Sequence, residues 1–284
     1  NPNNQAVTTD LTMSFRGFIK YHFLTTNQIK WSVGVGVAHQ SNGHTRLLNQ
    51  GYNSALISIS ADIKNRKRTS EEIIQNSNSS FSKSSYSYFR FSSGLGKNVL
   101  ALAFNDKKNV YTISGVYGRV WNNRYKLGLG FNYRFYEQYY DYIKGDESLV
   151  NEGREFAHFK ENPGWYASNI AITINGEYLL NHIGVDFQIG FNLHKPAYKI
   201  DWRINQGWDN PPRVLTETWM LGEYDTKYKL KQLISTRMGL KYYLIGTTKR
   251  PKHNLYAGCY INANLGQADF AELSLGYVYA FDFK

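Results

Sequence analysis

Apolar and polar residues alternate with a period of two along several long stretches of the chain. The most regular stretches cover residues 125–135, 183–193 and 272–283. Successive side chains of a β-strand point to opposite faces. Each stretch would therefore have one face of Leu, Ile, Val, Phe and Tyr and an opposite face of mostly glycine and polar residues. The pattern predicts an all-β protein.

The length of these stretches distinguishes two kinds of β protein. Each runs for about eleven or twelve residues, whereas strands of globular proteins usually have about five or six. A tilted strand of about 9–11 residues crosses a bilayer, with its apolar face toward lipid and its polar face toward the barrel interior. The pattern favours a transmembrane antiparallel up-and-down β-barrel of a Gram-negative outer membrane. A soluble sandwich is the alternative.

Eleven strands are expected, and their connections alternate in length. The strands are expected at residues 10–24, 29–41, 53–65, 86–104, 109–121, 125–137, 164–179, 183–194, 229–245, 254–265 and 270–283. Short turns at 25–28, 122–124 and 180–182 and long external loops at 138–163 and 195–228 place the C-terminus in the periplasm. Bacterial single-chain barrels have an even strand number. We therefore expect about 12 strands in one domain, 1–284, with upstream strands lacking or one strand unrecognised.

Composition excludes other classes of membrane and secreted protein. Aromatic residues make up 16% of the chain and the mean hydropathy is −0.49. No stretch approaches the roughly 18–20 apolar residues of a spanning helix. The single cysteine, Cys259, excludes an internal disulfide, and the histidines show no metal-ligand spacing. Residues 1–10 lack the pattern of a signal peptide. We expect neither a metal nor a cofactor.

The charge of the chain is +11, and its basic residues cluster at 64–68 and 249–253, between strand-like runs. No nucleic-acid motif accompanies these clusters, so phosphate headgroups of lipids are the favoured partners and nucleic acid is not expected. By parity, several charged side chains fall on the inner face, where a solvated or salt-bridged lumen is expected. They are Lys126, Arg134, Glu177, Asp186, Arg237, Lys241 and Glu272.

Polar residues continue the apolar rows of two neighbouring strands. The row from Trp31 to Val37 leads by parity into His39 and Ser41, and the row of 55–63 leads back to Asn53. A serine, a histidine and an amide on one face are the parts of a hydrolytic triad. The alternative is that these polar residues only mark the place where the strands leave the bilayer.

The run His39-Gln40-Ser41-Asn42-Gly43, followed by Asn49-Gln50-Gly51, resembles the signature of the acyloxyacyl hydrolase family, the PagL-type lipid A 3-O-deacylases. The motif resemblance covers about residues 29–63. The run 262–270 is similar to that of longer Bacteroidetes-like members, which usually have strands before the signature. The resemblance implies that lipid A or lipopolysaccharide of the outer leaflet is the substrate.

The resemblance assigns Ser41 as the nucleophile, His39 as the general base and Asn42 as an oxyanion donor, with Asn49 and Gly51 in the matching segment. The chain departs from the family at Asn53, where the family has an acidic residue. An asparagine can orient an imidazole, but it brings no negative charge to stabilise an imidazolium.

Two functions from different classes follow. The first is an outer-membrane esterase that removes an acyl chain from lipid A through Ser41 and His39 on the lipid-facing wall. The second is a catalytically weak or inactive barrel of the same type that serves as a structural or interaction subunit with other outer-membrane proteins. A pore or a small-molecule transporter is a third alternative.

Overall fold

The structure is a computed structural model. It describes residues 12–26, 28–42, 52–63, 84–101, 104, 106–205, 225–265 and 267–283. The chain divides into two compact units, one containing strands β1–β3 and the other containing strands β4–β11. Among the described residues, no helix is long and apolar enough to span a membrane.

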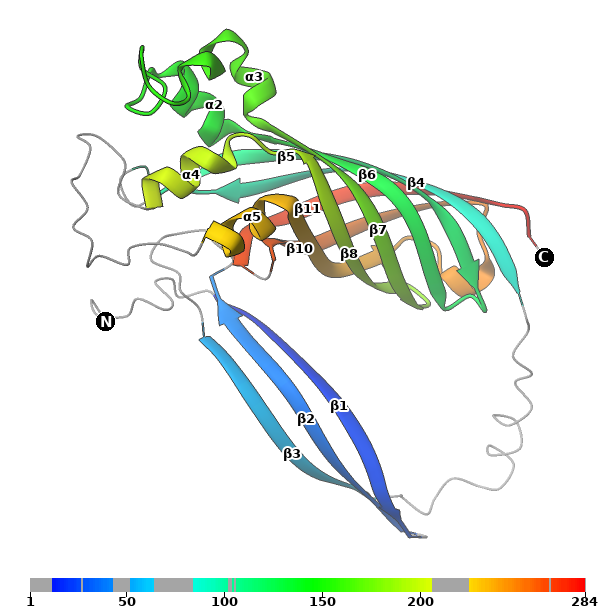
Figure 1. Cartoon of the computed structure of the whole chain (residues 1–284). Coiled ribbons are helices and arrows are strands. Elements are labelled where there is room, and N and C mark those ends of the chain that lie inside the picture. Colours follow the sequence, from blue (N-terminus) through cyan, green and yellow to red (C-terminus); the bar gives the residue numbers. More distant parts are fainter. Residues whose placement is uncertain are drawn as a thin grey trace. The chain divides into compact units, whose positions relative to one another are not determined.

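The first unit is an antiparallel sheet of three strands in the order β1-β2-β3 (Figure 1). Its strands are β1 (Met13–Thr25), β2 (Ile29–Ser41) and β3 (Tyr52–Ile63). One face is apolar, because rows such as Ile19, Val35 and Ile57 lie side by side across the strands. The opposite face is polar. There the Ser32 and Ser60 hydroxyls are 2.9 Å apart, and Lys20 Nζ lies 3.4 Å from Ser60 Oγ.

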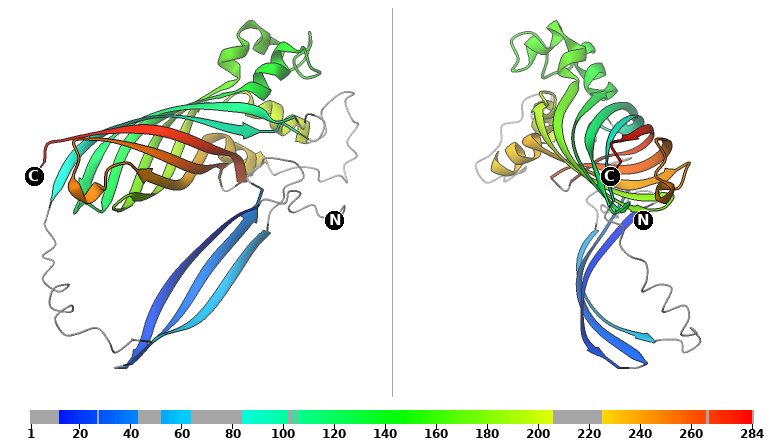
Figure 2. Two further views of the ribbon diagram at one scale, coloured as in Figure 1. Left: turned by 180° about the vertical axis from the view of Figure 1, so that it is seen from behind. Right: turned by 90° about the vertical axis from the view of Figure 1, so that its right-hand side faces the viewer.

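The second unit is a closed antiparallel barrel of eight strands (Figure 2). The strands are β4 (Ser85–Asn98), β5 (Lys108–Trp121), β6 (Tyr125–Tyr136), β7 (Ser168–Leu180), β8 (Ile183–His194), β9 (Ile234–Tyr243), β10 (His253–Asn264) and β11 (Gln267–Phe281). The last strand pairs with the first of the barrel over eleven residue pairs, from Ala271 with Lys97 to Phe281 with Ser87. This pairing closes the barrel and leaves none of its strands with a free edge.

The all-β prediction is confirmed, but the prediction of a barrel of about 12 strands is wrong. Eight strands close the barrel, because β11 occupies the edge of β4 that a larger barrel would have to offer to another strand. Strands β1–β3 form a separate sheet. That residues 1–284 make one domain stays a prediction.

Several expected strand limits also differ from the structure. β4 ends at Asn98, not at 104, and the expected start of β9 at 229 belongs to helix α5 (Asp225–Leu233). The run Lys229-Leu230-Lys231-Gln232-Leu233 consists of good helix formers, so local propensity favours a helix there.

Connections of two lengths gather at the two ends of the barrel. At one end, here called the short-turn end, Asn122 and Asn123 have φ of 53° and 52° and form a tight hairpin, which requires residues that tolerate positive φ. The connection from β9 to β10 contains the 3₁₀ helix η2 (Thr247–Lys249). The opposite end, here called the loop end, carries α2 (Glu137–Lys144), η1 (Ala157–Glu161), α3 (Pro163–Tyr166), α4 (Tyr198–Asn205) and α5. The short turns expected at 122–124 and 180–182 are confirmed, but the alternation is not strict, because β10 ends at Asn264 and β11 begins at Gln267 at the loop end.

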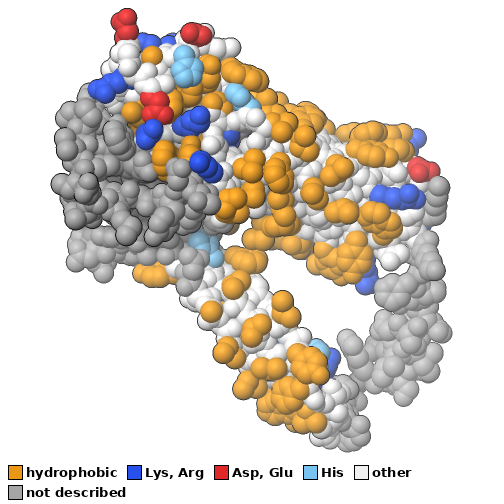
Figure 3. All heavy atoms as spheres, in the orientation of Figure 1, with side chains coloured by type: hydrophobic (Ala, Val, Ile, Leu, Met, Phe, Trp, Pro, Cys, Tyr) orange, Lys and Arg blue, Asp and Glu red, His pale blue; other side chains and the backbone are white. Residues whose placement is uncertain are grey.

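The outer wall of the barrel is apolar over the length of the strands (Figure 3). Leu129, Ile174 and Leu275, for example, are 64%, 52% and 72% exposed. Aromatic side chains lie on the wall toward both ends. Trp121, Tyr125, Tyr242 and Tyr277 belong to the short-turn half, and Tyr111 of β5 lies toward the loop end, where Trp165 of helix α3 is also exposed.

The interior of the barrel is filled by side chains in three layers. A cluster that includes Tyr86, Val120 and Val278 fills the short-turn end. A cluster that includes Val110, Tyr136 and Phe270, covered by residues of α2 and α4, fills the loop end. Buried charged residues occupy the middle. An eight-stranded barrel is just wide enough for its interior to be filled in this way.

Candidate functional site

The strand register places His39 and Ser41 on the apolar face of the three-stranded sheet and pairs His39 with Asn53 of β3. His39 of β2 lies directly opposite Asn53 of β3, in the row next to Val37 and Ala55. Opposite residues of antiparallel strands have Cα atoms about 4.5–5.5 Å apart. The backbones of His39 and Asn53 are therefore neighbours across the strand pair.

Ser41 ends strand β2, two residues after His39, and pairs with Met13 of β1. Residues i and i+2 of a strand share a face at a spacing of about 6.5 Å. His39 and Ser41 thus share one face of β2, and the backbone of Asn53 lies opposite His39 on the neighbouring strand. The order serine, histidine, asparagine is that of nucleophile, base and orienting group in a hydrolytic triad.

Of the remaining predicted site residues, the structure describes only some. Asn42 directly follows Ser41 at the end of β2 and is described. Asn49 and Gly51 fall outside the described residues. The order of the strands therefore brings His39, Ser41, Asn42 and Asn53 to one end of the sheet.

A second group of chemically active side chains lies inside the barrel. Glu177 of β7 and Asp186 of β8 are direct cross-strand partners, and both side chains are buried. Lys241 contacts both carboxylates, at 2.8 Å in the case of Glu177, and Arg90 Nη1 donates to Asp186 at 2.8 Å. The two cations offset the repulsion between the two carboxylates.

Two more groups complete this network, which we call the central ion cluster. Tyr243 donates its hydroxyl to Glu177 Oε1 at 2.5 Å, and Lys126 Nζ donates to the same hydroxyl at 2.8 Å. Lys126 also lies 3.5 Å from Glu177. Each cation of the cluster is thus beside a carboxylate, as a buried charge requires.

A separate buried pair lies closer to the loop end. Arg237 donates to both oxygens of Glu272, at 2.6 and 3.2 Å. Asn262 and Thr112 also donate to this carboxylate, at 2.8 and 3.1 Å. A two-point guanidinium contact is the strongest geometry of such a pair. Both side chains are almost completely excluded from solvent.

A buried lysine lies just beyond β8, at the loop end. Lys195 Nζ donates to the carbonyl of Lys231 and to Asn264 Oδ1, both at 2.8 Å, and sits 4.1 Å above the Tyr198 ring. Burial lowers the pKa of Lys195 to about 7. Sequence parity could not find this residue, because it lies in a connection and not in a strand.

The predicted interior position is confirmed for the seven charged residues named from parity. All of them are buried. Six of them form ion pairs, and Arg134 lies over the Phe270 ring. Arg90, Asn175 and Tyr243 were missed, although Arg90 alternates with Phe89 and Phe91 and the same parity would have found it. In the part of the chain that the structure describes, no three His, Cys, Asp or Glu side chains gather as metal ligands.

These features define the class of protein to which the barrel belongs. Long strands present a continuous apolar wall flanked by aromatic side chains, and the polar and charged groups turn inward. This is the architecture of barrels that cross the outer membrane. The chain is a Gram-negative outer-membrane β-barrel protein.

No protein-family model matches the chain, and no curated protein matches it in sequence. Among solved structures, Neisserial surface protein A is 10% identical, with 69% of this chain and 97% of that chain covered and a TM-score of 0.32. A de novo designed transmembrane β-barrel is 8% identical, with 69% and 95% covered and a TM-score of 0.30. An outer membrane channel from Pseudomonas putida F1 is 9% identical, with 95% and 85% covered and a TM-score of 0.24. The resemblance to acyloxyacyl hydrolases rests on its sequence motif.

Proposed function

We propose that the protein is an outer-membrane esterase that removes an acyl chain from lipid A. The observation that carries the proposal is the register that sets His39 opposite Asn53, with Ser41 two residues further on the same face. The apolar row of Val33, Val35 and Val37 leads directly to these residues. An acyl chain could lie along this row. Ser41 and Asn42 at its end are 1% and 2% exposed, so attack on the ester requires the end of the row to open to the substrate.

The chemistry divides among the residues as follows. The Ser41 hydroxyl attacks the ester carbonyl while the His39 imidazole accepts its proton, and the same imidazole later returns a proton to the leaving alcohol. Asn42, next to the nucleophile, would donate to the tetrahedral oxyanion, a contribution of about 3–4 kcal/mol in a site that excludes water. Water then hydrolyses the acyl-enzyme.

Asn53 sets the expected rate. Its side-chain oxygen can accept from an imidazole N–H and hold the ring, but an amide cannot neutralise the imidazolium that forms during attack. In serine proteases, replacing the triad acid by its amide lowers turnover by about ten-thousandfold. Slow turnover is therefore expected, together with acceleration by an acid at this position.

Mass spectrometry of lipid A after incubation with the purified protein in detergent tests the proposal. We expect loss of one acyl chain with the native protein, none with Ser41→Ala, and faster loss with Asn53→Glu. Ser58→Ala is the matched control, because it removes a hydroxyl from the polar face of the same sheet. Intact lipid A with the native protein and with Asn53→Glu would refute the esterase proposal.

A second candidate function is that of a structural or interaction subunit. Within the described residues, β1 and β3 are the edge strands of their sheet, and Ile19 and Ile57 on its apolar face are 80% and 83% exposed. Free strand edges pair readily with other strands. In this case Ser41→Ala would leave an isolated outer-membrane complex intact, and Ile57→Lys would dissociate it. A pore is disfavoured, because side chains fill the described barrel.

A further inference from the structure

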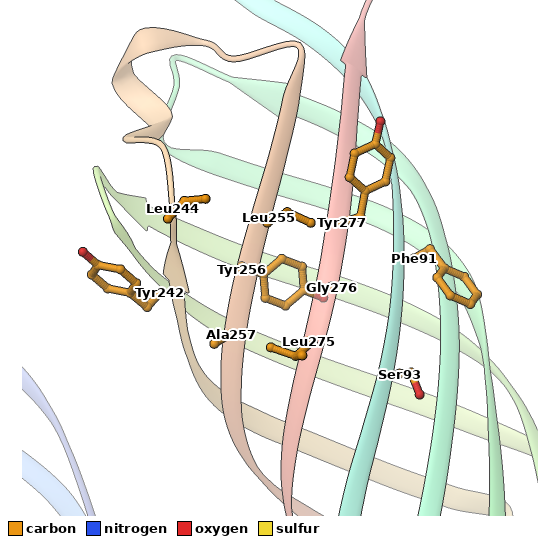
Figure 4. A pocket seen from close by; sticks show the side chains of 10 residues that line it. All are labelled: Phe91, Ser93, Tyr242, Leu244, Leu255, Tyr256, Ala257, Leu275, Gly276 and Tyr277. Atoms are coloured by element: carbon orange, nitrogen blue, oxygen red, sulfur yellow. The ribbon is translucent and has the colours of Figure 1, made fainter.

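The outer wall of the barrel carries a groove in its short-turn half, over β9, β10, β11 and β4. Two rows of outward residues line it (Figure 4). The row nearer the short-turn end is Leu244, Leu255, Tyr277 and Phe91, and the next row is Tyr242, Ala257, Leu275 and Ser93. Ala257 and Ser93 are small where their neighbours are large. The result is a groove of about 450 Å³.

A basic rim adjoins the groove at the short-turn end. His253 pairs with Tyr279 in the next row, and its Nδ1 lies 2.6 Å from the Tyr277 hydroxyl. Lys252 Nζ lies 5.8 Å from the centre of the Tyr279 ring. Tyr277 therefore belongs both to the groove and to the rim, so that an apolar surface leads directly to a cluster of donors.

The charge of the rim has one sign along the whole connection. The run 246–254 contains Lys249, Arg250, Lys252 and His253 and no acidic residue. Asp282 follows β11 at the same end of the barrel, but the net charge of the rim remains positive. Basic residues at the end of a membrane-spanning segment attract anionic headgroups, and aromatic rings are enriched at this level of a bilayer.

We propose that this groove binds an anionic phospholipid, with one acyl chain over Ala257 and Ser93 and the phosphate beside Lys252 and His253. The wall faces lipid, so acyl chains are the material that fills an apolar depression in it. Contact with the Tyr279 ring orients the lysine ammonium, and the histidine is held by its contact with Tyr277. Charge then selects an anionic lipid over a zwitterionic lipid with the same chains.

Nanodiscs that contain equimolar palmitoyl-oleoyl phosphatidylglycerol and phosphatidylcholine provide the test. The full chain is reconstituted in these nanodiscs and then released from them in the mass spectrometer. The lipids that stay bound to the protein are counted. We expect retention of phosphatidylglycerol over phosphatidylcholine. Lys252→Gln should lower this preference roughly fivefold, which corresponds to ~1 kcal/mol for one basic residue near an anionic surface. Ala257→Trp, which fills the groove, should reduce retention of both lipids.

Lys144→Gln is the matched control. Lys144 Nζ also lies over a tyrosine ring, 5.5 Å from the centre of Tyr140, but at the loop end. Lys144→Gln should leave the preference for phosphatidylglycerol unchanged. Ser93→Leu repeats the filling of the groove with a smaller change, and the electrophoretic mobility of unheated protein checks that each variant is folded. Equal retention of the two lipids by the native chain, or unchanged retention in folded Ala257→Trp and Ser93→Leu, would overturn the proposal.

Discussion

The pair of Arg237 and Glu272 offers the sharpest test of how the barrel interior is stabilised. Glu272→Leu removes the carboxylate that accepts four hydrogen bonds, two of them from the guanidinium. The Arg237 side chain is 2% exposed, so its charge would be left buried without this partner. Breaking such a pair costs about 3–5 kcal/mol. Replacing both partners, as in Arg237→Met with Glu272→Leu, should recover most of that loss.

Urea unfolding in detergent micelles, followed by tryptophan fluorescence, measures these differences. Lys160→Gln is the control, because it removes an ion pair with Asp146 whose side chains are 38% and 59% exposed. An exposed pair is worth about 0–1 kcal/mol. If Glu272→Leu costs no more than Lys160→Gln, the interior is hydrated and the argument from buried charge is wrong. Failure of the double variant to recover stability would show that shape, not charge, dominates.

Three further predictions concern single positions of the barrel. Burial lowers the pKa of Lys195 from 10.5 to about 7. Between these values the unfolded chain holds the extra proton, so stability against urea should rise with pH from 7 to 10.5, and Lys195→Met should flatten the rise. Gly130→Ala should lower the free energy of unfolding by about 1–3 kcal/mol, because the new methyl group would meet the Gly115 carbonyl. Gly176→Ala should be tolerated, because the nearest atom to its new methyl group is 3.9 Å away. The urea midpoints of the two variants test this difference. Asn123→Val should slow refolding and destabilise the hairpin, because a β-branched residue resists the φ of 52°.

The period of two in the sequence predicted the inner side of the barrel wall for seven charged residues. Glu177 and Asp186 alternate with Tyr178 and Val185, so one strand assignment places both carboxylates inside. The sequence could not predict which cations they meet. Arg90 lies 96 residues before Asp186, and their contact depends on the closure of the barrel.

Closure itself was beyond sequence reasoning. A strand that alternates apolar and polar residues fits any barrel wall, whatever the number of strands. The number of strands depends on which strand pairs with β4. Both β3 and β11 have the alternation that this pairing requires. The even-number rule therefore led to about 12 strands, whereas pairing of β11 with β4 closes the barrel at eight.

The three-stranded sheet shows why sequence can indicate a candidate site but not the surroundings of its strands. Parity along β2 and β3 is a local property, and it assigned His39 and Asn53 to one face of neighbouring strands. The direct pairing of the two residues depends on the register between the strands. Whether an ester can reach Ser41 depends on what lies against the apolar face and beside the edges of β1 and β3, which local parity does not encode. The esterase and assembly functions both require the apolar face of the sheet. An acyl chain and a protein partner would therefore compete for the same row of valines. An Ile57→Lys variant that loses both lipid A deacylation and complex formation would indicate that one surface serves both.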